Sequence, residues 1–101
     1  FFHSAVKHPQ RKRRYFAGAY SFRRDGDGYA PRDASQSPLL IASKRDGFQW
    51  PEGSTFWEPI VVFPSGAVFD RSRETWVVAS GINDCFCTVF EIPHKELLKN
   101  F

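Results

Sequence analysis

The sequence predicts an all-β fold made of antiparallel sheets that are covered on both faces. Aromatic residues make up 17% of the chain, and Phe alone occurs 11 times, a composition that suits pleated, packed sheets. Short apolar segments alternate with polar or glycine-containing turns along most of the chain. A chain of 101 residues forms one domain at most.

Each apolar segment is read as a strand because it is short, rich in β-branched or aromatic residues, and bounded by turn residues. The segment 24–28 pairs Gly with Asp, residues 70–74 are all polar, and residues 44–47 end a strand. Only residues 93–98 read as a helix, with Pro93 suited to its first turn. The predicted strands are Phe1–Val6, Tyr15–Arg23, Leu39–Ser43, Ile60–Asp70, Thr75–Ser80 and Cys85–Ile92.

Several of these strands are apolar on both faces. In the segment 60–69, Val61, Phe63, Ala67 and Phe69 would point one way, and the alternate residues, including Val68, would point the other way. A sheet with one solvated face alternates apolar with polar residues instead. Short antiparallel sheets stacked face to face are the arrangement of β-propeller blades, so we expect about one and a half to two such blades.

An internal repeat supports this interpretation. Residues 1–5, a basic loop and residues 15–22 follow the same plan as residues 76–80, a turn and residues 86–92. We therefore assign residues 1–43 to three strands of one blade and 60–92 to three strands of the next, joined by an inter-blade loop. Residues 44–59 form that loop, and residues 93–101 form a short C-terminal tail.

Up-and-down strand order has a consequence for the loops. Residues 7–14, 44–59 and 81–84 should meet at one face of the predicted blades, and residues 24–38 and 71–74 should lie at the other. The first set brings together carboxylates and aromatic rings, including Trp50. Its candidate substrate-binding residues are His3, Tyr15, Trp57, Glu58, Asn83 and Asp84.

Carboxylates beside aromatic rings suit sugars, since carboxylates bind hydroxyls and rings cover the apolar faces of the sugar. A pair of carboxylates across a glycosidic bond could also perform acid–base chemistry. Each residue also has a structural interpretation: Asp84 as a turn residue, His3 and Trp57 as packing residues, and Glu58 as a surface group before a strand.

Other classes of function have less support. The net charge of +3 is too small to identify an anionic partner, and the basic run 11–14 suits a solvated loop or a phosphate contact. Strand faces this apolar do not suit a nucleic-acid module. No run is long enough to span a membrane, and neither a signal-peptide pattern nor metal-ligand spacing is visible. We expect Cys85 and Cys87 to be buried free thiols, which favours a cytoplasmic setting.

Five motifs, in order, resemble the C-terminal half of glycoside hydrolase family 130, the β-mannoside phosphorylases and β-mannosidases, which are five-bladed β-propellers. The resemblance covers about residues 1–92. The motifs are HSAV at 3–6, YFAGAYSF at 15–22, SPLL at 37–40, VVFPSGAV at 61–68 and WVVASGIND at 76–84.

The resemblance implies a sugar-binding role for Asp84, a phosphate contact for His3 and a pocket-lining role for Tyr15. It implies inorganic phosphate as co-substrate in a phosphorylase, and no other cofactor. The aromatic pair that precedes the family's last aspartate is missing here, Asn83 is new, and Ile60 stands where the family tends to carry Asn. The family's catalytic acid lies in blades upstream, so the catalytic residues are unknown.

We therefore expect the C-terminal part of a propeller that acts on glycosides by phosphorolysis or hydrolysis. The alternative is a non-catalytic propeller that binds a glycan or a protein. The expected partners are a carbohydrate and the remaining blades of the same polypeptide, without nucleic acid or membrane. The chain starts at Phe1 and contains no Met, which favours a piece of a longer protein that is marginally folded and inactive alone.

Overall fold

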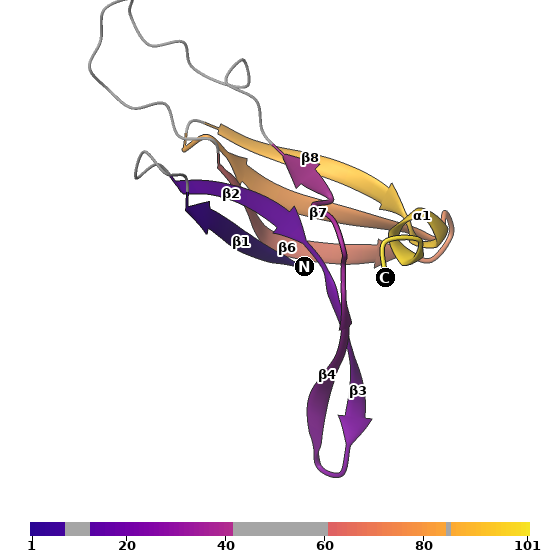
Figure 1. Ribbon diagram of the computed structural model, residues 1–101. Coiled ribbons are helices and arrows are strands. Elements are labelled where there is room, and N and C mark those ends of the chain that lie inside the picture. The colour runs from indigo at the N-terminus through magenta and orange to yellow at the C-terminus, as the bar shows by residue number, and fades with distance from the viewer. Residues whose placement is uncertain (8–12, 42–60, 85) are drawn as a thin grey trace, which may run out of the picture.

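The computed structural model describes residues 1–7, 13–41, 61–84 and 86–101 (Figure 1). The described residues form eight strands and one short helix. The elements are β1 (Phe2–Lys7), β2 (Arg13–Gly18), β3 (Tyr20–Asp25), β4 (Gly28–Ala34), β5 (Leu40–Ile41), β6 (Val62–Asp70), β7 (Thr75–Ile82), β8 (Phe86–Pro93) and α1 (His94–Leu98). The predicted all-β class is confirmed.

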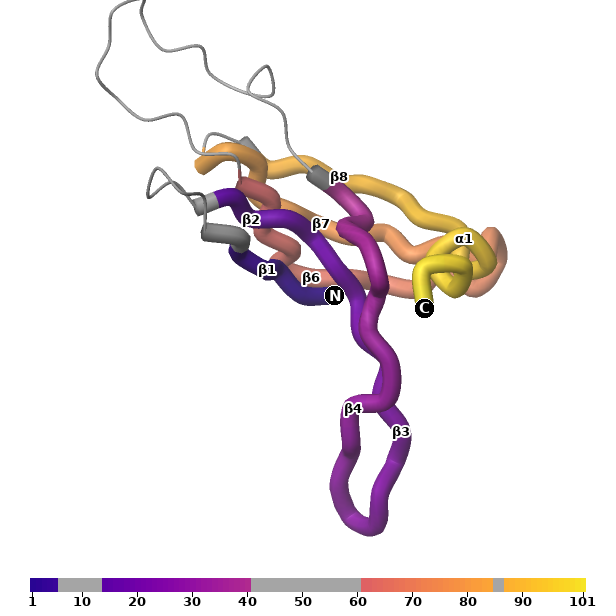
Figure 2. The backbone as a smooth tube through the Cα atoms, viewed as in Figure 1, coloured from indigo at the N-terminus to yellow at the C-terminus, as the bar shows by residue number. Residues whose placement is uncertain are grey.

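The strands form three antiparallel sheets, in the orders β1-β2-β5, β3-β4 and β6-β7-β8. The β1-β2-β5 sheet lies over the β6-β7-β8 sheet, and the β3–β4 hairpin extends away from both (Figures 1 and 2). All three sheets are open. Their assignment to the blades of a propeller stays a prediction.

One predicted strand is divided in two. The segment Tyr15–Arg23 was expected to be continuous, but Ala19 separates β2 from β3, which belong to different sheets. Ser35 explains the break, because its hydroxyl accepts a hydrogen bond from the Ala19 amide (3.1 Å) and its own amide donates to the Ala19 carbonyl (2.7 Å). The predicted loop 24–38 also contains a strand, β4, which pairs with β3.

The core lies between the two larger sheets. Ala17, Val62 and Ile82 form a buried cluster, against which Leu40 and Phe90 pack. These residues come from both sheets, so burial of their side chains holds the sheets together. Full burial of a Val or Ile side chain contributes about 1.5–3 kcal/mol relative to its exposed state.

A second cluster, of aromatic rings, lies at the end of the sheets where α1 is found (Figure 1). The Phe69 ring lies 5.0 Å from the Trp76 ring and 5.6 Å from the His94 ring. The Trp76 indole N–H donates to Nδ1 of His94 (3.2 Å), and Leu97 of α1 is buried. The predicted C-terminal helix is therefore present and is anchored to β7.

The prediction that strand 60–69 is covered on both faces is wrong. An irregularity between Pro64 and Gly66 leaves Ser65 without a cross-strand partner, and such a bulge reverses the side-chain alternation of later residues. Ala67 and Phe69 therefore pair with residues on the buried face of β7, whereas Phe63 pairs with Gly81 on the other face.

The outer face of the β6-β7-β8 sheet is open. Val68 and Val89 are 70% and 60% exposed on it, although the sequence predicts that the strand of Val68 is covered on both faces. Cys87 is also exposed, contrary to the prediction of a buried thiol. Cys85 lies outside the described residues. None of the described helices is long and apolar enough to cross a membrane.

Candidate functional site

The candidate site lies at the end of the sheets where β1 and β7 finish and where β2, β6 and β8 begin (Figure 1). The β7–β8 turn, with Asn83 and Asp84, lies at this end. The predicted site residues Trp57 and Glu58 lie outside the described residues, and so does Trp50.

Asn83 and Asp84 both have left-handed backbone conformations, with φ values of 51° and 54°. Asn and Asp tolerate this region better than other non-glycine residues, so the residue types match the turn. Two successive left-handed residues reverse the chain between β7 and β8.

Asn83 binds the turn to the start of β6. Its backbone amide donates to the Val61 carbonyl (2.9 Å), and its side-chain Oδ1 accepts from the Val61 amide (2.8 Å). The residue is only 6% exposed. The Asn83 side chain thus satisfies a buried amide and fixes the position of its neighbour, Asp84.

Asp84 is exposed. Within the part of the chain that the structure describes, no hydrogen bond or ion pair engages its carboxylate. The carboxylate oxygens are therefore accessible as acceptors for hydroxyl groups, and Asn83 holds the backbone that carries them.

A cluster of three rings near this turn joins the edge strand β6 to the β1-β2-β5 sheet. The exposed His3 ring of β1 lies parallel to the Phe63 ring of β6, with centroids 4.1 Å apart and an interplanar angle of 28°. The Tyr15 ring of β2 is 5.9 Å from His3 on its own sheet. The sequence analysis identified His3 and Tyr15 as candidates but missed Phe63. The available signal was its position at the start of β6, next to Val62.

The turn and the ring stack are close along β6. Phe63 lies two residues after Val61, to which Asn83 is hydrogen-bonded, and two residues of strand span about 7 Å. The structure therefore brings His3, Tyr15 and the Asn83–Asp84 turn to one end of the sheets. An exposed carboxylate near an aromatic stack presents both hydroxyl-binding and apolar surfaces.

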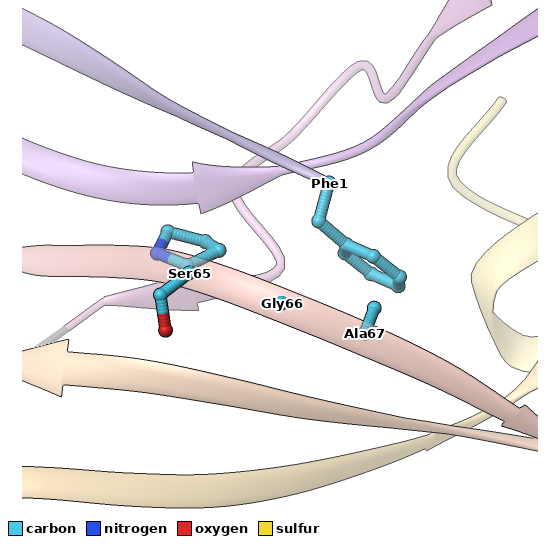
Figure 3. A pocket seen from close by; sticks show the side chains of 5 residues that line it. Phe1, Ser65, Gly66 and Ala67 are labelled. Carbon is cyan, nitrogen blue, oxygen red and sulfur yellow. The ribbon is translucent and has the colours of Figure 1, made fainter.

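A small cavity lies farther along β6, where Phe1 faces the bulge. It has a volume of about 140 Å³ and is lined by Phe1, Pro64, Ser65, Gly66 and Ala67, with the Phe1 ring beside Ala67 (Figure 3). Ligand pockets usually have about 300–1,000 Å³, so this cavity is too small for a sugar ring with its contacts.

Among the residues that the structure describes, no group of three or more His, Cys, Asp or Glu side chains is placed to hold a metal ion. Comparisons with protein-family models, with curated proteins and with solved structures found no match.

Proposed function

We propose that this chain is the C-terminal part of a glycosidase-like β-propeller that acts on glycosides, by phosphorolysis or hydrolysis of mannosides. In this proposal Asp84 binds sugar hydroxyls, His3 contacts phosphate or sugar, and Tyr15 lines the pocket. Trp57 and Glu58 form the rim, and Asn83 supports the sugar-binding turn. The general acid comes from the remaining blades of the same polypeptide, in a cytoplasmic protein.

The observation that carries the proposal is the exposed Asp84 carboxylate at the same end of the sheets as the His3–Phe63 stack. Sugars combine hydroxyl groups with apolar ring faces, so a carboxylate and an aromatic surface together match their chemistry. The strand orders β1-β2-β5 and β6-β7-β8 also agree with consecutive up-and-down blades.

A second candidate is a non-catalytic propeller that binds a glycan. The His3–Phe63 contact favours it, because a histidine ring stacked at 4.1 Å on an aromatic ring can form part of an apolar platform for a sugar. Both candidates require Asp84 to bind hydroxyls, and they differ in whether the bound glycoside is cleaved.

The test replaces Asp84 with Asn in the longer polypeptide that contains this chain. Asn keeps the size of the side chain and its tolerance of a positive φ, so the melting temperature should stay the same. We expect loss of β-mannoside binding in calorimetry and a steep fall in turnover, measured as release of mannose or of mannose 1-phosphate when phosphate is supplied.

The control is Asp27→Asn, the same substitution at an exposed turn of the β3–β4 hairpin. It should leave binding and turnover unchanged. Glycan binding by the unmodified protein without turnover would favour the non-catalytic candidate. Equal kinetics and equal binding for Asp84→Asn and the unmodified protein would refute both candidates.

A further inference from the structure

The β3–β4 hairpin carries an exposed aromatic row. Tyr20, Phe22 and Tyr29 are 47%, 58% and 73% exposed, and neighbouring rings lie 6.1 Å and 5.4 Å apart. With Pro31 they surround an open hollow of about 470 Å³. Contiguous exposed apolar patches of this kind mark interaction surfaces.

The hairpin forms a sheet of its own, since among the described strands β3 and β4 pair only with each other. An isolated two-stranded hairpin has marginal stability in water, and a third strand would stabilise it. The hairpin extends away from the two larger sheets (Figures 1 and 2), so a strand from another molecule has access to it.

The two edges of the hairpin are not equivalent. The edge of β4 contains Pro31, which has no amide hydrogen, and a bulge that places an extra residue on β4 between its partners of Tyr20 and Phe22. Both features protect an edge strand from further pairing. The edge of β3 has neither feature and is the one available for another strand.

The turn determines which backbone groups lie on that edge. Asp25 pairs with Gly28 across a two-residue turn, and in such hairpins this closing pair is hydrogen-bonded. Hydrogen-bonded pairs then alternate with non-hydrogen-bonded pairs. The amides and carbonyls of Phe22 and Arg24 therefore point outward from β3, and so do those of Tyr20, because β3 itself has no bulge.

The charge balance of the hairpin favours a second copy of this chain as the partner. Residues 20–34 contain three Arg and three Asp, so the hairpin has no net charge to repel its own copy, whereas the whole chain carries +3. We propose that two copies associate by antiparallel pairing of β3 with β3, which forms a four-stranded sheet with one continuous aromatic face.

Charge also selects the register. In a symmetric pair, placing Arg23 or Arg24 on the two-fold axis would oppose like charges, which destabilises a sheet. Placing Phe22 on the axis avoids this: Phe22 pairs with Phe22 of the second copy, and Tyr20 pairs with Arg24, an aromatic–cation contact. The outward backbone groups of these residues then form the new hydrogen bonds.

Cross-linking tests this register. In the longer polypeptide, with its native cysteines replaced by Ser, Phe22→Cys places two thiols opposite each other, with Cα atoms about 5.5 Å apart, within disulfide range. Arg24→Cys is the matched control on the same edge. Its two copies would be four residues out of register, about 13 Å apart. We expect a disulfide-linked dimer from Phe22→Cys under mild oxidation and none from Arg24→Cys.

Sedimentation velocity over a concentration series tests the association itself. The longer polypeptide that contains this chain should show a monomer–dimer equilibrium, and Phe22→Ser should raise the dissociation constant about tenfold or more. Val89→Ser is the control, because Val89 is similarly exposed at 60% but lies on β8. Phe22 is exposed, so circular dichroism should show folded protein for each variant.

Three outcomes would overturn the proposal. They are a monomer at every concentration, equal cross-linking of the two cysteine variants, and an equal loss of dimer from Phe22→Ser and Val89→Ser. The last of these would place the contact on the β6-β7-β8 sheet instead. A partner of a different kind on the hairpin would give the first outcome.

Discussion

Replacing Asn83 with Ala should destabilise the chain strongly, and the structure permits an estimate of how much. Two effects contribute to the loss of stability. The Val61 amide, buried beneath the turn, loses the Oδ1 acceptor at 2.8 Å, and an unsatisfied buried donor costs about 1–3 kcal/mol. Alanine at φ 51° adds about 1–2 kcal/mol of backbone strain. The sum is about 2–5 kcal/mol.

Asn83→Gly separates the two effects. Glycine adopts a positive φ without strain but offers no acceptor, so it should lose only the hydrogen-bond part, about 1–3 kcal/mol. The order of stability should be Asn, then Gly, then Ala, measured by urea denaturation of the longer polypeptide that contains this chain, with unchanged slopes. Asp84→Asn is the control, since it keeps a residue suited to its φ of 54°, and its stability should match that of the unmodified chain.

The reasoning would be refuted by an Ala variant within about 0.5 kcal/mol of the unmodified chain, the usual range of a neutral surface substitution. A Gly variant less stable than the Ala variant would contradict only the estimate of backbone strain at residue 83. Either result would also remove the structural account of why Asn stands at this position.

Three further predictions concern stability. Ser80→Ala should be neutral or stabilising by about 1 kcal/mol in thermal unfolding, because the buried Ser80 hydroxyl has no hydrogen-bond partner among the described residues; a loss above that amount would contradict this view. Gly18→Ala should cost about 1 kcal/mol, the lower end of the range for overpacking, because the added Cβ would lie 2.5 Å from the distal end of the Phe2 ring, which can shift; Phe2→Ala should relieve most of that cost in a double-mutant cycle. Hydrogen bonds from Ser72, and then from Arg73, hold the pKa of Asp70 well below its ordinary value of 3.8. The resulting stabilisation is complete above about pH 4 and is lost as the pH falls through the lowered pKa. Ser72→Ala should therefore make the free energy of unfolding, measured with urea, less dependent on pH below pH 4. An unchanged pH dependence would contradict this.

The all-β class could be predicted because it depends on local properties. The strands around Val62, Val78 and Phe90 are apolar, short and separated by turn residues, and these features do not require knowledge of distant contacts. The short C-terminal helix was also predicted correctly, since Pro93 precedes it and its apolar Leu97 is buried.

The faces of β6 could not be predicted in the same way. The alternation rule placed Phe63 with Ala67, but the bulge after Pro64 moves them to opposite faces. Pro64 and Gly66 are residue types that often mark a bulge, but the register shift itself depends on which residues of β7 pair with β6. The break at Ala19 has the same origin, because it depends on Ser35, sixteen residues away.

The same distinction between local and tertiary information applies to the candidate site. The sequence alone determined that Asn83 and Asp84 form a turn after an apolar strand, because these residue types favour left-handed backbone conformations. It also identified His3 and Tyr15 as residues near that turn. Only the tertiary structure decided that Asn83 is buried against Val61 while Asp84 is exposed, and that His3 stacks on Phe63. The physical reason is that turn propensity is a property of neighbouring residues, whereas burial and ring contacts arise only when two sheets distant in sequence pack together.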